Sequence, residues 1–338
     1  MITIDGSEGE GGGQVLRNAC ALSLVTGEPF VIENVRGGRE KPGLMRQHMT
    51  AIEAACAIGG AECEGLAIGS SRVAFRPGRV RAGDYTFSVG TAGSTGLVLQ
   101  TVLLPLALAD APSRLVLEGG THAAMAPPFE FIARAFLPLI ARMGPQVSAR
   151  LSRHGFYPRG GGRIEIEIAP APLRRIECLD RGAPTGHAGQ ALVASLPGEI
   201  AVRLIKAARK ELPAWSEQDF AIRELPADQG PGAVVLLDAA FEQVTEVVAG
   251  FGKLGVTAEK LGHTAGKRMA GYLASNAFAG PYLQDQLLLP FGLAGGGAFT
   301  SVKLSEHTRT AADVVGRFTG RRVRFQDMPG GVRLVEVL

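Results

Sequence analysis

The sequence contains 338 residues, of which 46% are hydrophobic and 20% are charged, and its formal net charge is +3. This composition can supply a globular core, and it excludes a disordered chain or a histone-like polycation. The length predicts about two domains. Glycine accounts for 46 residues, roughly twice the usual share, without a Gly-X-Y period. We therefore expect many tight turns or places where the backbone closely approaches a ligand.

Three further features of the composition bear on the kind of protein: its basic residues, its cysteines and its apolar stretches. Arginine outnumbers lysine by 28 to 7, and arginine is the better bidentate ligand for phosphate. The four cysteines form no C-x-x-C pair, which argues against a structural zinc site and predicts a reduced, cytoplasmic protein. The N-terminus lacks signal-peptide features, and the most apolar stretch, 97–109, is too short to cross a bilayer. We therefore predict no membrane association.

Hydrophobic periodicity predicts a mixture of helices and strands. Several of the predicted helices open after glycine and end at Gly or Pro; they cover 14–26, 43–58, 95–109, 128–143, 200–211, 258–275, 282–292 and 311–318. The clearest predicted strand is 163–168, where hydrophobic and charged residues alternate. Shorter strands are predicted at 114–118 and 233–239.

The order of these elements indicates repetition and an insertion. A glycine cluster, a long apolar helix, a strand, a second helix and further strands follow one another over about 9–80 and again over about 88–168, and a third glycine cluster stands at 295–297. The stretch at about 183–278 has a different composition, and four of the seven lysines lie between Lys206 and Lys260. We predict an α+β fold with one large domain, 1–182 and 279–338, and a smaller α/β domain inserted at 183–278.

The first chemically suggestive segment is the glycine-rich loop 5–14, which leads into the first predicted helix. Backbone N–H groups at the start of a helix attract anions. Glu10 adds negative charge to this loop, and a divalent ion shared between its carboxylate and a phosphate would reconcile the two. A glycine turn with a solvated glutamate is the alternative.

Two further glycine turns precede helices. The loop 36–48 carries Arg36, Arg39, Lys41 and Arg46, which suits a phosphate chain or a nucleic-acid backbone, although a solvated charge run is the alternative. The turn 90–96 precedes a helix in which Gln100 lies among apolar residues. Gln100 needs a polar partner, either a core carbonyl or a ligand.

Several familiar nucleotide motifs are missing. The chain has no P-loop, no dinucleotide-binding glycine pattern and no K-x-D-G motif of lysine-dependent nucleotidyl transfer. None of the six histidines stands in a catalytic-triad or H-E-x-x-H pattern. A nucleotide-using enzyme with this sequence would need a different set of binding and catalytic residues.

Taken together, several short blocks resemble one known family. They follow one another in order over almost the whole chain: 5–6 with 9–14 and Arg17, 36–39 with 41–44 and 46–48, 93–94 with Gln100, 126–128, 153–158 with 160–162, 228–232, 282–283 with 285–286, and His307. In these blocks the sequence resembles the RNA 3'-terminal phosphate cyclase family. The resemblance implies a large domain of repeats, each with two helices on a four-stranded sheet, and a small inserted α/β domain.

The activity that the resemblance implies is an ATP-dependent ligase reaction. It would convert an RNA 3'-phosphate to a 2',3'-cyclic phosphodiester through a histidine-AMP intermediate and an adenylated RNA end. By position, His307 is the expected nucleophile, and Glu10 the expected ligand of a divalent cation, Mg²⁺ or Mn²⁺. The residues expected to meet ATP phosphates or the RNA end are Arg17, Arg36, Arg39 and Gln47. The residues expected to bind ATP are Gln100, Pro127, Tyr282, Leu283, Gln284, Asp285 and Gln286.

Two positions depart from the pattern of many relatives. Ala311 stands where relatives carry Asn, and His122 where they carry Asp or Asn, so the fine positioning of the site is open. The alternatives are a non-catalytic ribosomal RNA-processing branch of the same family, which lacks the nucleophilic histidine, and an enolpyruvyl transferase-like enzyme. RNA with a 3'-phosphate is the expected partner. The sequence leaves the oligomeric state open, a homodimer included.

Overall fold

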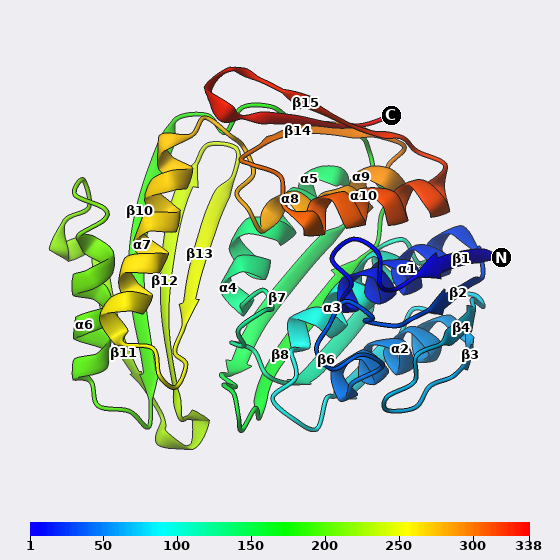
Figure 1. The fold of residues 1–338 in the computed structure, drawn as a ribbon, viewed down its shortest axis with the longest axis horizontal. Helices are drawn as coiled ribbons and strands as arrows, with labels where there is room; N and C mark the ends of the chain where they lie inside the picture. The colour runs from blue at the N-terminus through cyan, green and yellow to red at the C-terminus, as the bar shows by residue number, and fades with distance from the viewer.

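Three segments of the chain fold into the same βαβαββ unit, in which helices cover one face of a four-stranded sheet (Figure 1). The computed structural model describes residues 1–338. The first unit comprises β1 (Ile2–Asp5), α1 (Gly13–Thr26), β2 (Phe30–Glu33), α2 (Arg46–Gly59), β3 (Glu62–Glu64) and β4 (Val73–Arg76). The second comprises β5 (Asp84–Ser88), α3 (Thr95–Ala107), β6 (Ser113–Gly119), α4 (Phe129–Phe131), a π-helical turn (Ile132–Phe136), α5 (Leu137–Met143), β7 (Gln146–Arg153) and β8 (Gly162–Ala169).

The third unit is interrupted by the small domain. It comprises β9 (Glu177–Cys178) before the interruption, and α8 (Leu283–Gln286), α9 (Leu288–Leu293), β14 (Gly297–Ser301), α10 (Glu306–Thr319), β15 (Val323–Asp327) and β16 (Arg333–Val337) after it. The strand orders β1-β2-β4-β3, β5-β6-β8-β7 and β9-β14-β16-β15 are equivalent. In each sheet the first two strands are parallel and the others are antiparallel to their neighbours.

The inserted domain has a different topology. Its elements are β10 (Pro184–Ala194), α6 (Glu199–Arg209), a short 3₁₀ helix (Glu217–Asp219), β11 (Phe220–Leu225), a second 3₁₀ turn (Ala227–Gln229), β12 (Gly232–Phe241), β13 (Thr245–Phe251) and α7 (Ala258–Ala274), with strand order β11-β10-β12-β13. Helices α6 and α7 pack side by side on this sheet, at the left of Figure 1. Phe156, from the large domain, packs against a separate apolar cluster of this sheet that includes Leu192 and Val234.

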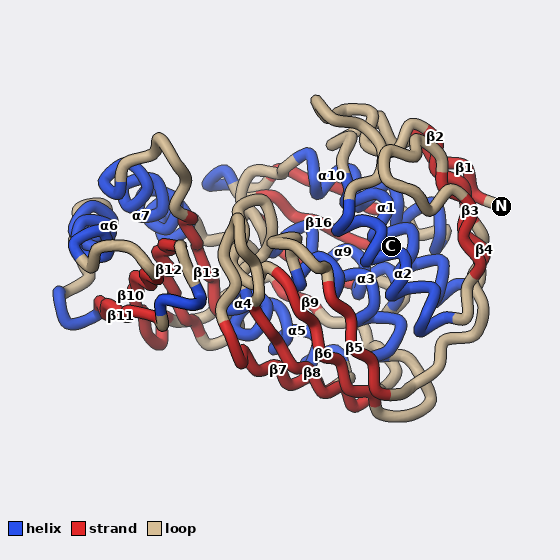
Figure 2. The backbone as a smooth tube through the Cα atoms, turned by 90° about the horizontal axis from the view of Figure 1, so that it is seen from below, coloured by secondary structure: helices blue, strands red, loops and turns tan.

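The helices of the three repeated units gather between the sheets, which lie toward the outside (Figures 1 and 2). Helix α1 packs against α2, α3 and α10, so it is enclosed on most sides. This explains why its residues Ala19 to Leu24 form an unbroken buried run, whereas a surface helix would bury only one stripe. The start of α1 is thereby held beside elements of the other two units.

The predicted α+β fold is confirmed. The predicted insertion, 183–278, contains the β10–β13 sheet and both of its helices, and its exact bounds stay a prediction. One helix prediction was wrong at its start: α10 begins at Glu306 and not at 311. The hydroxyl of Ser305 accepts a hydrogen bond from the Thr308 backbone N–H at 3.2 Å, which is a helix N-cap.

Two other predicted helices are interrupted. The helix predicted over 128–143 contains the π-helical turn, which ends two residues before Pro138. Proline has no N–H to offer the preceding turn. The helix predicted over 282–292 is divided at Leu287 into α8 and α9. None of the helices combines the length and the apolar composition that crossing a lipid bilayer would require.

Candidate active site

The candidate site lies where the loop before α1 meets the first turn of α10. The backbone N–H of Glu10 donates to Oγ1 of Thr310 at 2.9 Å, which ties the glycine-rich loop to α10. Gly9 has a φ of +61°, and a Cβ on it would lie only 2.4 Å from the same Thr310 oxygen. Glycine is therefore required here by both the backbone conformation and the close approach.

His307, in the first turn of α10, is oriented by a buried chain of polar side chains. Its Nδ1 lies 3.0 Å from Oε1 of Gln14. The Nε2 amide of Gln14 donates to Oδ2 of Asp285 at 2.7 Å, so the Gln14 oxygen is the atom left to accept. Nδ1 of His307 must then carry the proton, and in the neutral ring Nε2 keeps its lone pair.

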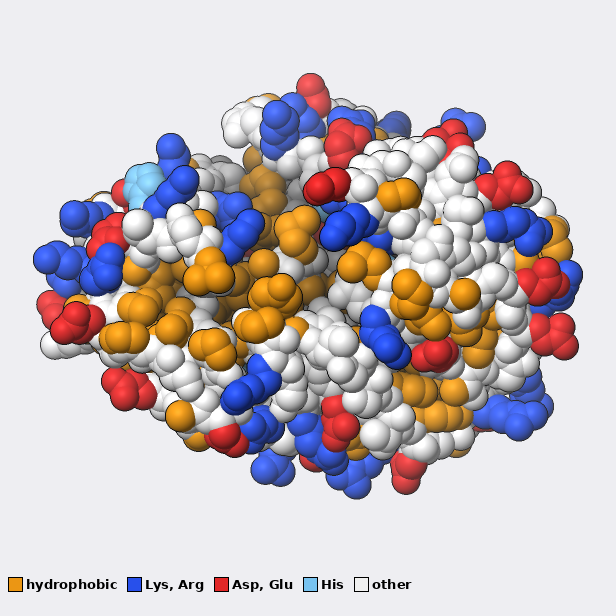
Figure 3. Space-filling view, turned by 60° about the horizontal axis from the view of Figure 1, so that its bottom comes forward, with side chains coloured by type: hydrophobic (Ala, Val, Ile, Leu, Met, Phe, Trp, Pro, Cys, Tyr) orange, Lys and Arg blue, Asp and Glu red, His pale blue; other side chains and the backbone are white.

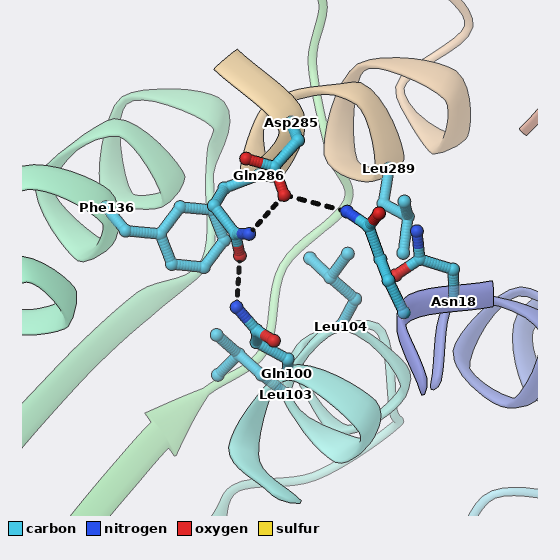
Figure 4. Close-up of a pocket in the computed structure, with 9 residues that line it drawn as sticks. Asn18, Gln100, Leu103, Leu104, Phe136, Asp285, Gln286 and Leu289 are labelled. Atoms are coloured by element: carbon cyan, nitrogen blue, oxygen red, sulfur yellow. Dashed lines mark hydrogen bonds between the residues drawn. The ribbon is translucent and has the colours of Figure 1, made fainter. Parts of the chain in front are cut away.

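Asp285 also connects this chain to a pocket (Figure 4). Gln286 donates from Nε2 to Oδ2 of Asp285 at 2.9 Å, and Oε1 of Gln286 accepts from Nε2 of Gln100. The pocket is lined by Gln14, Asn18, Gln100, Leu103, Leu104, Phe136, Asp285, Gln286 and Leu289. Burial raises the pKa of Asp285 to about 7, although the hydrogen bonds and the charge of Arg17 oppose this.

Glu10 is a buried carboxylate beside the histidine. Its side chain is 7% exposed, and its Oε1 lies 3.8 Å from Nε2 of His307. The guanidinium of Arg39 contacts Oε1, yet neither carboxylate oxygen accepts a hydrogen bond. A buried carboxylate needs a compensating positive charge. Arg39 supplies this charge here, and a divalent cation would supply it equally, so Glu10 fits the role of a ligand for such a cation.

Arginine and histidine side chains gather near this carboxylate. Burial lowers the pKa of Arg17 to about 10 despite the nearby Asp285, and Nε of Arg17 has no hydrogen-bond partner. Burial, with Arg17 and Arg36, lowers the pKa of His48 to about 3. Burial, with Arg39 and Arg17, also lowers the pKa of His307. His307 is therefore neutral, and hence nucleophilic, at pH 7.

Three other residues expected in the site, Arg36, Gln47 and Pro127, make contacts with neighbouring backbone or glycines. Arg36 donates to the carbonyl groups of Lys41 and Gly43 at 2.7 and 2.8 Å, so it also braces its own loop. Gln47 lies against Gly93, where an added Cβ would be 3.0 Å from the Gln47 Cβ. Pro127 lies equally close to Gly96, because a Cβ added to Gly96 would be 3.0 Å from the Pro127 carbonyl oxygen.

The predicted ATP-binding residues divide into two groups. Gln100, Asp285 and Gln286 line the pocket, whereas Leu283 and Gln284 are fully buried beneath it. The Gln284 amide donates to the carbonyl groups of Pro281 and Lys303, so it holds the backbone and does not face the pocket. Tyr282 is exposed, and its hydroxyl accepts a hydrogen bond from Arg268 at 3.0 Å.

The sequence-based assignment of site residues omitted Gln14, Asn18 and Phe136, which line the pocket, and Thr310. The Nδ2 amide of Asn18 is buried without a hydrogen-bond partner. A signal for this pair was present, because Gln14 and Asn18 are four residues apart in a mostly apolar helix. Residues at that spacing share one helix face.

Comparison with known proteins finds related sequences along nearly the whole chain. A sequence model described as RNA 3'-terminal phosphate cyclase matches residues 8–325. A protein of Koribacter versatilis named RNA 3'-terminal phosphate cyclase is 49% identical over 319 residues, which are 94% of this chain and 90% of that protein. Proteins of the same name from Ralstonia nicotianae and Ectopseudomonas mendocina are 47% and 45% identical; the matches span 94% of this chain and 91% and 92% of theirs.

The repeated βαβαββ units, the inserted domain and these matches define the class. The chain belongs to the RNA 3'-terminal phosphate cyclase family, and it is an enzyme of that family.

Proposed function

We propose that this enzyme uses ATP to convert an RNA 3'-terminal phosphate to a 2',3'-cyclic phosphodiester, through a covalent intermediate between His307 and AMP. The observation that carries the proposal is the hydrogen bond between Nδ1 of His307 and Gln14. It leaves the Nε2 lone pair available beside Glu10, in a ring that is half-exposed at 48%. A nucleophile needs this combination of a fixed orientation and access to substrate.

In the first step Nε2 of His307 attacks the α-phosphorus of ATP. The N–P bond forms, the bond from the α-phosphorus to the bridging oxygen breaks, and pyrophosphate leaves. The lowered pKa of His307 keeps the ring neutral for this attack. Arg17 and Arg39, which already lie near this ring, would offset the negative charge of the phosphates.

Glu10 would hold the divalent cation. When bound, the cation supplies charge neutralisation for the phosphates as pyrophosphate departs. The buried carboxylate of Glu10, which lies 3.8 Å from Nε2 of His307, supports this role. Thr310 fixes the backbone of Glu10 through the 2.9 Å hydrogen bond.

In the second step an oxygen of the RNA 3'-phosphate attacks the phosphorus of AMP, and the N–P bond to His307 breaks. In the third step the neighbouring 2'-oxygen attacks the RNA phosphorus, and AMP leaves as the ring closes. The 2'-oxygen is already beside the phosphorus, so proximity supplies much of the rate. The chain's task in this step is to hold the RNA end, for which Arg36 and Gln47 are candidates.

The polar pocket has about 30 Å³ of open space, which is too little for a nucleobase, so it would form only one edge of the site for the adenosine part of ATP. Its amides come from Gln14, Asn18, Gln100 and Gln286, and amides offer both donors and acceptors to the edge of a base. The unpartnered Nδ2 of Asn18 supports a ligand here. Pro127 and the segment 282–284 would act from the periphery of this pocket or beneath it.

The surface favours contact that is limited to the end of an RNA. On the face drawn in Figure 3, Lys and Arg side chains are scattered among acidic ones and form no continuous basic field. A protein that binds a long nucleic-acid backbone usually carries such a field. The net charge of +3 agrees with this view.

The proposal is tested with an end-labelled RNA that carries a 3'-phosphate. With ATP and Mg²⁺, the label should become resistant to phosphatase, and His307→Asn should slow this at least about 10³-fold. His263→Asn is the matched control, because His263 is an exposed histidine on α7 that lies 2.8 Å from Glu211. Cyclisation without ATP, or cyclisation by His307→Asn at the unmodified rate, would overturn the proposal.

A further inference from the structure

A second cluster of metal-ligating side chains shares no residue with the pocket. His122 follows β6, Glu130 lies in α4 and His154 follows β7. The three residues are 2%, 5% and 7% exposed, and one ligand atom from each lies within 4.8 Å of the others. The two imidazole rings are stacked, with their centroids 5.1 Å apart.

The hydrogen bonds of His122 allow it to present Nε2 to the cluster. Nε2 lies 2.8 Å from Oε2 of Glu130, and Nδ1 lies 2.8 Å from Oγ1 of Thr121. The same Thr121 oxygen accepts a hydrogen bond from the Gly155 backbone N–H at 2.9 Å. A hydroxyl oxygen has a second lone pair, so it can also accept from an Nδ1–H of His122. A bound metal ion would then take the place of the proton that lies between Nε2 of His122 and Glu130.

The tautomer of His154 is set by Gln229. Both the backbone N–H and Nδ1 of His154 lie 3.1 Å from Oε1 of Gln229. Because a backbone N–H can only donate, the shared atom is an acceptor, and Nδ1 must carry a proton. Nε2 of neutral His154 therefore keeps its lone pair, and it has no hydrogen bond in the structure.

Both histidines therefore have an oxygen acceptor behind the ring, and both can offer the other nitrogen to an ion. This arrangement is the usual one for metal-bound histidines, in which the outer hydrogen bond fixes the tautomer and the ring orientation. A buried carboxylate completes a two-histidine, one-carboxylate donor set. Imidazole nitrogen favours transition metals over Mg²⁺ or Ca²⁺.

We propose that His122, Glu130 and His154 bind one divalent transition-metal ion, with zinc the best match, and that water takes the fourth position. Ligand atoms at tetrahedral zinc are about 3.3 Å apart, which lies between the 2.8 Å of the His122–Glu130 pair and the 4.8 Å limit of the cluster. The missing cysteine pairs led us to expect no structural zinc, and this site would instead use nitrogen and oxygen donors.

The position of the cluster indicates what the ion would do. Gln229 belongs to the inserted domain, and it bonds to His154 of the large domain. Arg153, the residue before His154, and Asp228, the residue before Gln229, form an ion pair at 2.7 Å. Phe156 packs into the small-domain sheet and lies 5.4 Å from the His122 ring. An ion here would hold the two domains together at their junction.

The test is zinc binding by the full chain, produced without a histidine tag and stripped of metal with a chelator. Zinc is then titrated in competition with a chromophoric chelator, and thermal unfolding is followed with and without zinc. We expect one tightly held zinc per chain and an unfolding midpoint raised by several degrees. Glu130→Gln, which keeps the shape of the side chain, should weaken zinc binding at least about tenfold.

Two control variants separate this site from others. His263→Asn removes an exposed histidine–carboxylate pair, and Glu10→Gln alters the active-site carboxylate; neither should change the tightly held zinc. If Glu10→Gln abolishes it while Glu130→Gln keeps it, or if the unmodified protein holds no zinc, the proposal is overturned. Should Glu130→Gln fail to fold, Co²⁺ in the unmodified protein decides: intense tetrahedral absorption bands support the site, and weak octahedral bands or none overturn it.

Discussion

Nδ1 of His307 and Oε1 of Gln14 are 3.0 Å apart, although the two residues are 293 positions apart in the chain. This contact joins the first and the third repeated unit at the centre of the molecule. It fixes which nitrogen of the histidine carries the proton, because the amide of Gln14 is itself held by Asp285 at 2.7 Å. The proposed chemistry depends on that assignment, since Nε2 is the nitrogen that has to attack.

Gln14→Leu should slow the transfer of AMP to the enzyme by about 10²-fold, because a loosely held imidazole loses its alignment with the α-phosphorus. The measurement is single-turnover labelling with α-labelled ATP. Gln326→Leu on β15 is the matched control, since Gln326 is exposed. An unchanged rate in Gln14→Leu would show that this hydrogen bond does not orient the nucleophile.

Glu10→Gln should raise the divalent-cation concentration needed for half-maximal adenylation by about tenfold or more, because the amide is a weaker ligand than the carboxylate. Glu8→Gln is the control within the same loop; Glu8 is exposed and lies 3.5 Å from Arg317. The quantity to compare is the Mg²⁺ titration of single-turnover labelling. Superimposable titrations for Glu10→Gln and the unmodified enzyme would refute the role of Glu10 as a ligand.

Gly9→Ala should impair adenylation, while Gly27→Ala should leave it intact. Both glycines have positive φ, +61° and +78°, but an added Cβ meets Thr310 at 2.4 Å only at Gly9, and nothing within 4 Å at Gly27. Each variant should lose about 1 kcal/mol of stability from the backbone conformation, and Gly9→Ala should lose more. Urea unfolding and adenylation rates measure the two effects; equal losses in both variants would contradict the importance of the close contact.

Glu246→Gln should flatten the pH dependence of stability. Glu246 is fully buried; burial raises its pKa to about 8, and the hydrogen bond from Gly280 at 3.2 Å offsets this only in part. Between about pH 5 and pH 8 the native state keeps a proton that the unfolded state has released. This group therefore makes the unmodified protein less stable as pH rises, by at most about 1.4 kcal/mol per pH unit.

The comparison needs urea unfolding of both proteins across this range, with the exposed Glu53→Gln as control. The difference in the free energy of unfolding between the unmodified protein and Glu246→Gln should change steadily with pH. A constant difference would mean that Glu246 is already ionised in the native state.

The sequence predicts local structure here better than it predicts contacts. Hydrophobic periodicity located the main helices, because each repeated unit buries helix faces against its own sheet. It missed the true start of α10, where the cap at Ser305 extends the helix back past His307. It also gave no sign of the pairing of β9 with β14, because β9 has two residues and the inserted domain separates the two strands.

The site shows the same limit. The resemblance to a family directed attention to Glu10, Asp285 and His307, and the structure places these three residues close to Gln14 or to one another. Their mutual geometry comes from contacts across about 300 positions, which spacing along the chain does not reveal. Gln284 belonged to the same sequence block as Asp285, but it faces the backbone of neighbouring segments. Only the three-dimensional structure separates these two neighbours.

The most direct test of the central claim is to locate the AMP on the enzyme. The purified protein, freed of bound nucleotide, is incubated with ATP and Mg²⁺ in the absence of RNA, digested under alkaline conditions and analysed by mass spectrometry. The account predicts one acid-labile, alkali-stable AMP per chain, attached to Nε2 of His307 and absent from His307→Asn. Attachment of AMP to another residue, or full cyclase activity without any covalent AMP, would contradict it.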